Sequence, residues 1–213
     1  MPVIEHFQPF YFHFRTPKAE PAAFKFYPRY VTSEDVVIEV GARVGGATCV
    51  LARLARKVYS FEPNPYAYKL LKTCTSGLKN LETFNIALGA SEGTAILHTN
   101  GSFKASPLAS IKRQSRQSRS YEVRVATLDA MEFSERPTSL VMDCEGSELD
   151  VLQGGHETDQ GFQSLLVETH ETEKGKMNTE EVRDFVARSE RFSNLRVERD
   201  DEGNDWILAD RRP

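Results

Sequence analysis

The chain has 213 residues, which is enough for one α/β domain with a sizeable buried core and too few for two such domains. Its 27 basic and 31 acidic side chains give a net charge of −4, so it lacks the overall positive charge that attracts nucleic acid or an anionic membrane surface. Three widely separated cysteines argue against a disulfide framework or a metal knuckle and favour a reducing, cytoplasmic location, and no segment has the roughly 20 apolar residues of a membrane span.

Residues 1–34 are predicted to form an aromatic arm that precedes a single domain over residues 35–213. Charged residues and prolines interrupt the first twenty positions, unlike the apolar core of a signal peptide. The arm is expected to cover the sheet or a contact between subunits, or to act as a lid over a substrate. Its aromatic residues include Phe7, Phe10, Tyr11, Phe12, Phe14, Phe24, Phe26 and Tyr27.

From residue 35, short runs rich in β-branched residues alternate with helical patterns, which is typical of βαβ units and a mainly parallel sheet. Strands are expected at 35–40, 57–62, 81–88, 138–145 and 164–170, helices at 45–56, 66–77, 147–155 and 178–189, and a terminal hairpin at 195–201 and 204–210. Gly77 is expected to end the second helix. The predicted fold is therefore a doubly wound, mostly parallel α/β sheet with an antiparallel terminal hairpin.

The middle of the chain departs from this alternation. Residues 93–99 and 121–128 are predicted to form an extra pair of strands on either side of a polar, serine-rich loop at about residues 100–120. This loop is expected to be mobile. It forms either a solvated linker or a flap that binds a phosphate or carboxylate of the substrate. Its basic run consists of Lys112, Arg113, Arg116 and Arg119.

The loop "EVGARVGG" follows the first predicted strand, at the edge of the sheet where open α/β folds bind ligands. Arg43 stands where a dinucleotide fingerprint has its second glycine, and no Walker lysine follows, so a pyrophosphate is disfavoured. Gly41 and Gly45 alone would also fit a simple tight turn. Glu62, however, ends the next strand, where a carboxylate can accept hydrogen bonds from both ribose hydroxyls. A nucleoside cofactor without phosphates is therefore expected, and the carboxylates of Glu39 and Glu62 favour the cationic S-adenosylmethionine.

Several segments resemble, in order, the motifs of FkbM-type S-adenosylmethionine-dependent methyltransferases. They are "VVIEVGARVGGATCVLA", "VYSFEPNPYAYKLLK", "NIALGASEGTAIL", "VATLDAM", "VMDCEGSELDVLQGG" and "LLVETH", and they span residues 30–170. The resemblance implies a class I methyltransferase fold, with a seven-stranded sheet and a reversed last strand. It also implies O-methylation of a hydroxyl, with S-adenosylhomocysteine as the product of the cofactor.

The resemblance also assigns residues to the cofactor. It places the methionine end on Glu39, Gly41, Ala42, Gly45 and Thr48, the ribose on Glu62, and the adenine between Pro63 or Asn64 and Asn85, Ile86 and Ala87. Two positions depart from the family pattern, since Glu39 replaces an aspartate and Arg43 an asparagine. Arg43 is expected to turn outward, toward an anionic substrate.

The reacting groups are expected at the carboxyl ends of the fourth and fifth core strands. The candidates are Asp143, Glu145, Glu168 and His170. His170 can be a neutral general base near pH 7, oriented by Glu168 or Asp143, or it can be a surface histidine. Asp143 is expected either to act in catalysis or to hold the loop or the ammonium group of the cofactor. The other acids of this segment are expected to stabilise the start of the following helix. Ser147 and Asp150 have the spacing of an N-terminal cap, and Glu148 complements the helix dipole.

Asp143, Glu168 and His170 also permit a magnesium or manganese site, because a divalent cation can lower the pKa of a hydroxyl. No local spacing motif supports such a site, so no metal is expected. The predicted function is O-methylation of a small molecule or glycan that carries an anionic group. The alternatives are an RNA methyltransferase, which the net charge disfavours, and a non-catalytic module that binds S-adenosylmethionine. Neither nucleic acid nor a membrane is an expected partner.

Overall fold

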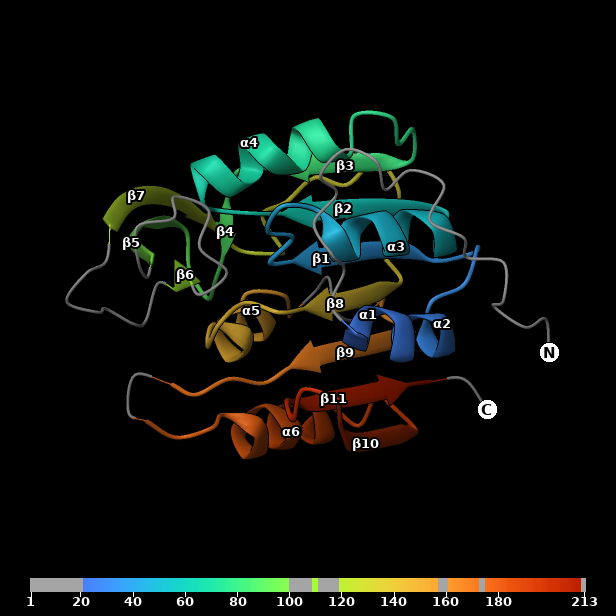
Figure 1. Ribbon diagram of the computed structural model, residues 1–213. Coiled ribbons are helices and arrows are strands. Elements are labelled where there is room, and N and C mark those ends of the chain that lie inside the picture. The colour runs from blue at the N-terminus through green and yellow to red at the C-terminus, as the bar shows by residue number, and fades with distance from the viewer. Residues whose placement is uncertain (1–20, 100–108, 111–118, 157–160, 173–174, 212–213) are drawn as a thin grey trace.

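The structure, a computed structural model, describes residues 21–99, 109–110, 119–156, 161–172 and 175–211. A seven-stranded sheet forms its centre, in the order β10-β11-β9-β8-β1-β2-β3 (Figure 1). The strands are β1 (Val36–Val40), β2 (Lys57–Phe61), β3 (Leu81–Phe84), β8 (Ser139–Met142), β9 (Ser164–Glu168), β10 (Asn194–Arg199) and β11 (Asp205–Asp210). Only β11 runs against its neighbours on both sides, so the predicted parallel sheet with a reversed strand and a terminal hairpin is confirmed.

Helices cover both faces of this sheet, which explains why its inner strands are mostly apolar. The helices are α1 (Pro21–Lys25), α2 (Tyr27–Tyr30), α3 (Gly46–Leu54), α4 (Pro65–Cys74), α5 (Glu148–Gln153) and α6 (Thr179–Arg188). On one face, α1, α2 and α3 pack against Val37, Val58 and Leu208. On the other face, α5 and α6 pack against alternate residues of the same strands, such as Ile38 and Ile207.

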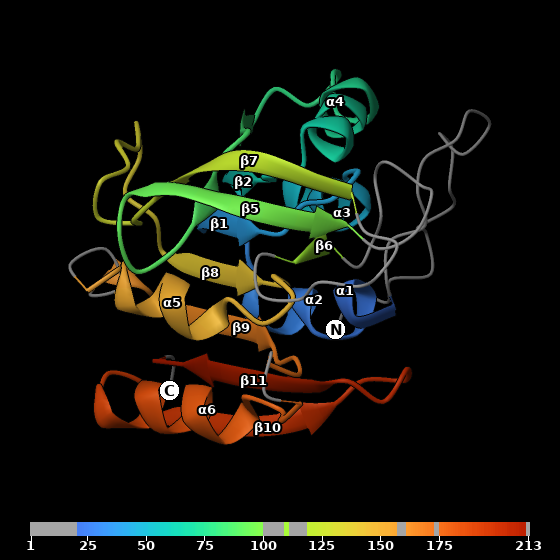
Figure 2. The same cartoon turned by 90° about the vertical axis from the view of Figure 1, so that its left-hand side faces the viewer.

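A second, four-stranded sheet contains β4 (Ala87–Leu88), β5 (Gly93–Thr99), β6 (Ala109–Ser110) and β7 (Arg119–Ala126). Strands β5 and β7 are the predicted extra pair, and they cross in front of the carboxyl ends of β1 and β2 (Figure 2). The predicted strand 81–88 is wrong as a single strand, because the chain leaves the central sheet after Phe84 and continues in the second sheet as β4. Asn85 fixes this break, since its amide donates to the backbone carbonyls of Glu62 (2.8 Å) and Pro63 (3.0 Å).

The described part of the N-terminal segment packs against the sheet. Phe26 is fully buried, and its ring lies 5.5 Å from that of Trp206 in β11, while Tyr27 lies 6.3 Å from the same ring. The side chain of Phe24 is half-exposed and lies outside this core. The aromatic residues of positions 1–20 and the basic side chains Lys112, Arg113 and Arg116 lie outside the described residues, whereas Arg119 begins β7.

The end of one predicted helix differs from the structure. Helix α4 ends at Cys74, before Gly77, and Thr75 is its C-cap residue, whose hydroxyl donates to the carbonyl of Leu71 (2.7 Å). Gly77 therefore does not end the helix as predicted. Among the described helices, none combines the length and the apolar character needed to cross a lipid bilayer.

Candidate functional site

The loop after β1 brings the ends of three strands together. Gly41 has a φ of +94°, and a Cβ atom at this position would lie 1.7 Å from the carbonyl oxygen of Asp143, so only glycine fits. The backbone N–H groups of Gly41 and Ala42 both donate to the carbonyl of Phe61 at the end of β2. Gly45, with a φ of +97°, then starts α3. The strands β1, β2 and β8 consequently end at one compact turn.

Arg43 also has a left-handed backbone, with a φ of +52°. This conformation costs a residue with a side chain roughly 1–2 kcal/mol, and asparagine and glycine adopt it more readily. The left-handed turn is therefore kept although this position holds a cationic side chain. Arg43 is partly exposed, and it lines the clefts on both sides of the turn.

Glu39 is buried beneath this turn. Its Oε2 atom accepts hydrogen bonds from Thr48 (2.7 Å) and from Ser60 (2.5 Å), which is its neighbour on β2. Its Oε1 atom is buried and has no hydrogen-bond partner among the described residues. Burial raises the pKa of Glu39 to about 7, against the opposing effect of the Ser60 and Thr48 hydrogen bonds. A buried acceptor of this kind fits a ligand that brings a positive charge or an N–H group.

Glu62 follows β2 and is also buried. One carboxylate oxygen accepts from the backbone N–H of Arg43 (2.8 Å) and the other from that of Asn64 (2.7 Å). Burial raises the pKa of Glu62 to about 7, although these two hydrogen bonds oppose the rise. Each oxygen has a second lone pair, so the two together can accept a pair of hydroxyl groups, as the sequence predicts for a ribose.

Two clefts flank the turn at residues 41–43. The larger, with about 630 Å³ of space including its open mouth, has apolar walls and contains Glu62 and Asp143 among its polar groups. Its apolar walls include Val40, Phe61, Pro63, Ile86, Ala87 and Leu97. The smaller, of about 460 Å³, runs past Glu39 to Tyr27. Volumes of this size suit a small molecule.

Two residues expected at the adenine have other contacts in the structure. Asn64 is fully buried, and its side-chain oxygen caps α4 by accepting from the backbone of Tyr66 and Ala67. Asn85 holds the carbonyls of Glu62 and Pro63, as described above. Both therefore shape the cleft from behind, while Pro63, Ile86 and Ala87 face it.

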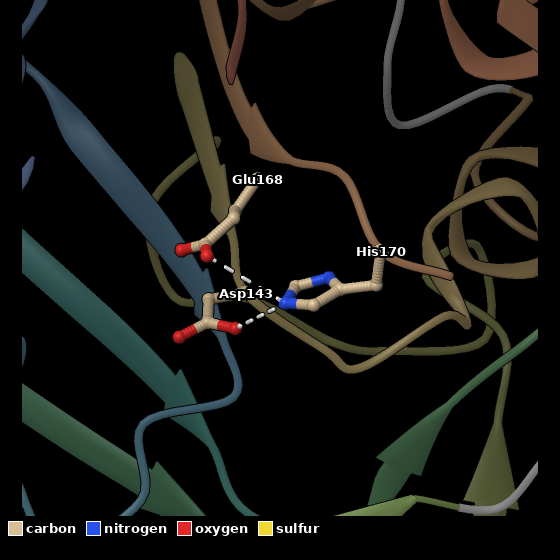
Figure 3. Close-up of side chains that lie close together, drawn as sticks. All are labelled: Asp143, Glu168 and His170. Atoms are coloured by element: carbon tan, nitrogen blue, oxygen red, sulfur yellow. Dashed lines mark ion pairs between the residues drawn. The ribbon is translucent and has the colours of Figure 1, made fainter. Parts of the chain in front are cut away.

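The three predicted reacting residues lie together at the ends of β8 and β9 (Figure 3). Asp143 directly follows β8, Glu168 is the last residue of β9, and His170 lies two residues farther on, beyond the strand that was predicted to include it. The His170 Nε2 atom is 3.3 Å from Asp143 Oδ1 and 3.7 Å from Glu168 Oε1. All three side chains are largely buried, but Asp143 reaches both clefts.

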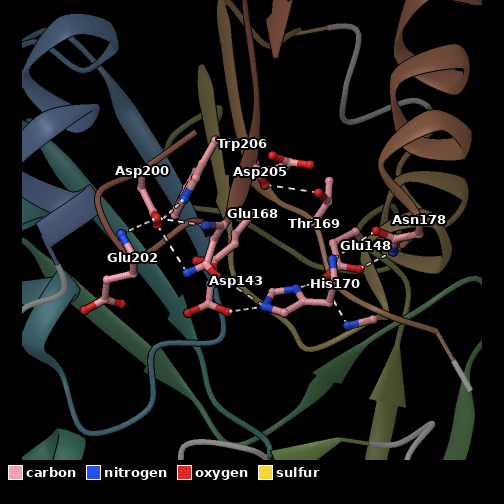
Figure 4. A network of polar contacts seen from close by, with 12 residues as sticks. Asp143, Glu148, Glu168, Thr169, His170, Asn178, Asp200, Glu202, Asp205 and Trp206 are labelled. Carbon is pink, nitrogen blue, oxygen red and sulfur yellow. Dashed lines mark hydrogen bonds and ion pairs between the residues drawn. The ribbon is translucent and has the colours of Figure 1, made fainter. Parts of the chain in front are cut away.

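Glu148 is the fourth member of this group, and the prediction that it serves only the helix dipole is wrong. Its carboxylate is completely buried and lies 2.7 Å from the Nδ1 atom of His170. It also accepts from the side-chain amide of Asn178 (2.6 Å) and from the backbone of Gly146 (3.0 Å), as part of the network in Figure 4. The side chain of Ser147 makes no capping hydrogen bond, so the predicted Ser147–Asp150 cap is also wrong.

The charge of this group follows from its contacts. Burial alone would lower the pKa of His170, but the hydrogen bonds and charges of Asp143 and Glu148 outweigh it and raise the pKa to about 11. In the absence of a bound ligand the ring is therefore an imidazolium near neutral pH. This differs from the neutral imidazole that the sequence led us to expect.

Comparison with known proteins agrees with this architecture. A family model described as "Methyltransferase FkbM domain" matches residues 39–193. The hexuronic acid methyltransferase AglP of Haloferax volcanii is 27% identical over 143 residues, which cover 64% of this chain and 56% of that protein. A probable cobalt-precorrin-6B C(15)-methyltransferase (decarboxylating) of Methanobrevibacter smithii is 42% identical over 60 residues, or 28% of this chain and 29% of that protein. The chain thus spans less than two thirds of either relative.

Solved structures share the fold at low sequence identity. A methyltransferase FkbM from Methylobacillus flagellatus superposes with a TM-score of 0.62 at 14% identity, covering 90% of this chain and 48% of that chain. TrmK of M. capricolum, solved with the cofactor product S-adenosylhomocysteine, superposes with a TM-score of 0.55 at 9% identity, covering 92% of this chain and 70% of that chain. These similarities concern the fold.

Proposed function

Because the chain belongs to the methyltransferase FkbM domain family, we propose that it transfers a methyl group from S-adenosylmethionine to a hydroxyl group of a small molecule or glycan. The buried pair Glu39 and Glu62 carries this proposal. Both carboxylates lie beneath one turn, and one oxygen of Glu39 has no hydrogen-bond partner in the described part of the chain, which suits a cationic ligand. The apolar cleft beside Glu62 offers a surface for a purine base.

We assign the parts of the cofactor as follows. Glu62 accepts the ribose hydroxyls, Pro63, Ile86 and Ala87 contact the adenine, and the methionine end lies near Glu39 and the turn at residues 41–45. When bound, the cofactor supplies an activated methyl group on a sulfonium. The protein then has to hold the acceptor oxygen in line with that group and to exclude competing water, and positioning of this kind can lower a barrier by about 7–11 kcal/mol.

We place the acceptor hydroxyl beside Asp143, Glu168 and His170. Asp143 lines both clefts, so its carboxylate lies at the junction between the proposed cofactor site and the space open to an acceptor. A base that removes the hydroxyl proton contributes about 10²- to 10⁴-fold to the rate. His170 holds the carboxylates of Asp143 and Glu168 in place. The substitution His170→Ala is therefore expected to leave cofactor binding intact and to slow turnover.

A sugar acid is the acceptor that the comparisons favour, since AglP is described as a hexuronic acid methyltransferase. Arg43, which lines both clefts, offers a positive charge to a carboxylate of such an acceptor. The test is transfer of a labelled methyl group from S-adenosylmethionine to a panel of neutral sugars, hexuronic acids and single-stranded RNA. Labelling of hexuronic acids supports the proposal, and labelling of RNA alone would contradict it.

A further inference from the structure

The side chains Asp143, Glu168 and His170 form a group in which the donor atoms all lie within 4.8 Å of one another. Ligands about 2.1 Å from a divalent ion in octahedral geometry are about 3.0 Å apart when adjacent and about 4.2 Å apart when opposite. The observed separations of 3.3 Å and 3.7 Å from His170 Nε2 to the two carboxylates fall in this interval. We propose that this group binds a divalent cation of the manganese type, and that the cation also binds the acceptor oxygen.

The contacts of His170 support the proposal independently of the three donors. A carboxylate can only accept, so the 2.7 Å contact with Glu148 requires a hydrogen on the Nδ1 atom. The backbone of His170 is fixed as well, because its N–H donates to the side-chain oxygen of Asn178 and its carbonyl accepts from the backbone of Asn178. The ring is therefore held with its Nε2 atom toward Asp143 and Glu168 (Figure 3). Metal-binding histidines show this arrangement, with a buried carboxylate on the other ring nitrogen.

The charges also favour a cation. Counted as carboxylates, Asp143, Glu148 and Glu168 carry three negative charges within contact of His170. A divalent cation would compensate two of these three charges. A divalent cation among these carboxylates would therefore lower the uncompensated negative charge of a largely buried site.

The donor set and the position indicate what the ion does. Two carboxylates and one imidazole suit manganese better than magnesium, which prefers oxygen ligands and water. Asp143 opens onto both clefts, so an acceptor oxygen can reach the ion. An ion held by Asp143, Glu168 and His170 would lower the pKa of the hydroxyl, and the proton would pass to water at the open mouth of the cleft. A lone pair of this oxygen then forms the new C–O bond, while the bond from the methyl carbon to sulfur breaks and leaves its electron pair on sulfur.

This inference rests on the proposed function for the role of the ion, but the binding itself is tested without turnover. Mn²⁺ is titrated into full-length, chelator-treated protein, and the six-line resonance of free Mn²⁺ is followed by electron paramagnetic resonance. We expect one bound ion per chain. Glu148→Gln should weaken binding about 10- to 100-fold, as removal of such a supporting carboxylate does. Asp143→Asn and Glu168→Gln should weaken binding at least as much.

Asp150→Asn is the matched control, because Asp150 is an acid on the same helix as Glu148 that lines a separate cleft. Its Mn²⁺ affinity should equal that of the parent protein. Thermal unfolding of every variant checks that the fold is kept. Asp143→Asn changes the least buried of the three carboxylates, so it tests the site even if the other variants unfold. The inference is overturned if the parent protein binds no Mn²⁺, or if Asp143→Asn and Asp150→Asn bind it equally. Binding of S-adenosylmethionine, measured in parallel, reports separately on the proposed function.

Discussion

Replacement of Gly41 by alanine tests the geometry that brings β1 and β8 together. The added Cβ would lie 1.7 Å from the carbonyl oxygen of Asp143, and this neighbour is backbone that cannot rotate away. The φ of +94° adds about 1–2 kcal/mol of backbone strain. Relief of the overlap requires a shift of the chain at Asp143, and such overpacking costs about 1–3 kcal/mol. We expect Gly41→Ala to lower the free energy of unfolding by about 3 kcal/mol.

Gly77→Ala provides the matched control. Gly77 has a negative φ, and a Cβ atom there would meet no atom within 4 Å. This substitution should leave stability unchanged or raise it by about 0.4–1 kcal/mol, because alanine has less freedom in the unfolded chain. Urea unfolding followed by circular dichroism measures the free energy of unfolding of both variants, and its dependence on urea concentration should be the same in each. A difference of less than about 1 kcal/mol between them would refute the close approach of Gly41 and Asp143.

Three further predictions concern burial and charge. Burial raises the pKa of Glu39 from 4.5 to about 7, so its contribution to stability is present below pH 4.5 and is lost as the pH rises to 7. Urea unfolding should show a free energy of unfolding that falls over this pH range in the parent protein and falls less steeply in Glu39→Gln. Glu148→Ala leaves His170 and Asn178 without their buried partner and should cost about 3 kcal/mol of unfolding free energy, and a loss below about 1 kcal/mol would argue against this network. Phe26→Ala should cost about 3–5 kcal/mol and the half-exposed Phe24→Ala less than about 1 kcal/mol, and equal losses would show that α1 and α2 do not pack as described.

The central sheet was predictable from the sequence because its strands are short apolar runs that alternate with helical patterns. The break after Phe84 was not, since residues 81–88 form one continuous pattern and only the side-chain contacts of Asn85 separate the two strands. Local pattern likewise cannot show which sheet a two-residue strand such as β4 joins.

The site was predictable in part. Glu39, Glu62 and Asp143 follow from their places at strand ends, but Glu148 was assigned to the helix dipole from its first-turn position alone. A signal for its burial was present, because Val151 and Leu152 lie three and four positions later and are buried on the same side of α5. The left-handed backbone of Arg43 and the approach of His170 to Glu148 depend on contacts between distant segments, which spacing along the chain does not reveal.

Calorimetry of the full-length protein with S-adenosylmethionine, S-adenosylhomocysteine and NAD tests the central claim most directly. We predict that the first two bind and that NAD does not, because Arg43 fills the place where a pyrophosphate would approach the turn. Glu62→Gln should weaken binding of S-adenosylmethionine about 10- to 100-fold, since it removes charge-assisted hydrogen bonds of about 1.5–3 kcal/mol. Binding of NAD without binding of S-adenosylmethionine, or an unchanged affinity in Glu62→Gln, would contradict the proposed cofactor site.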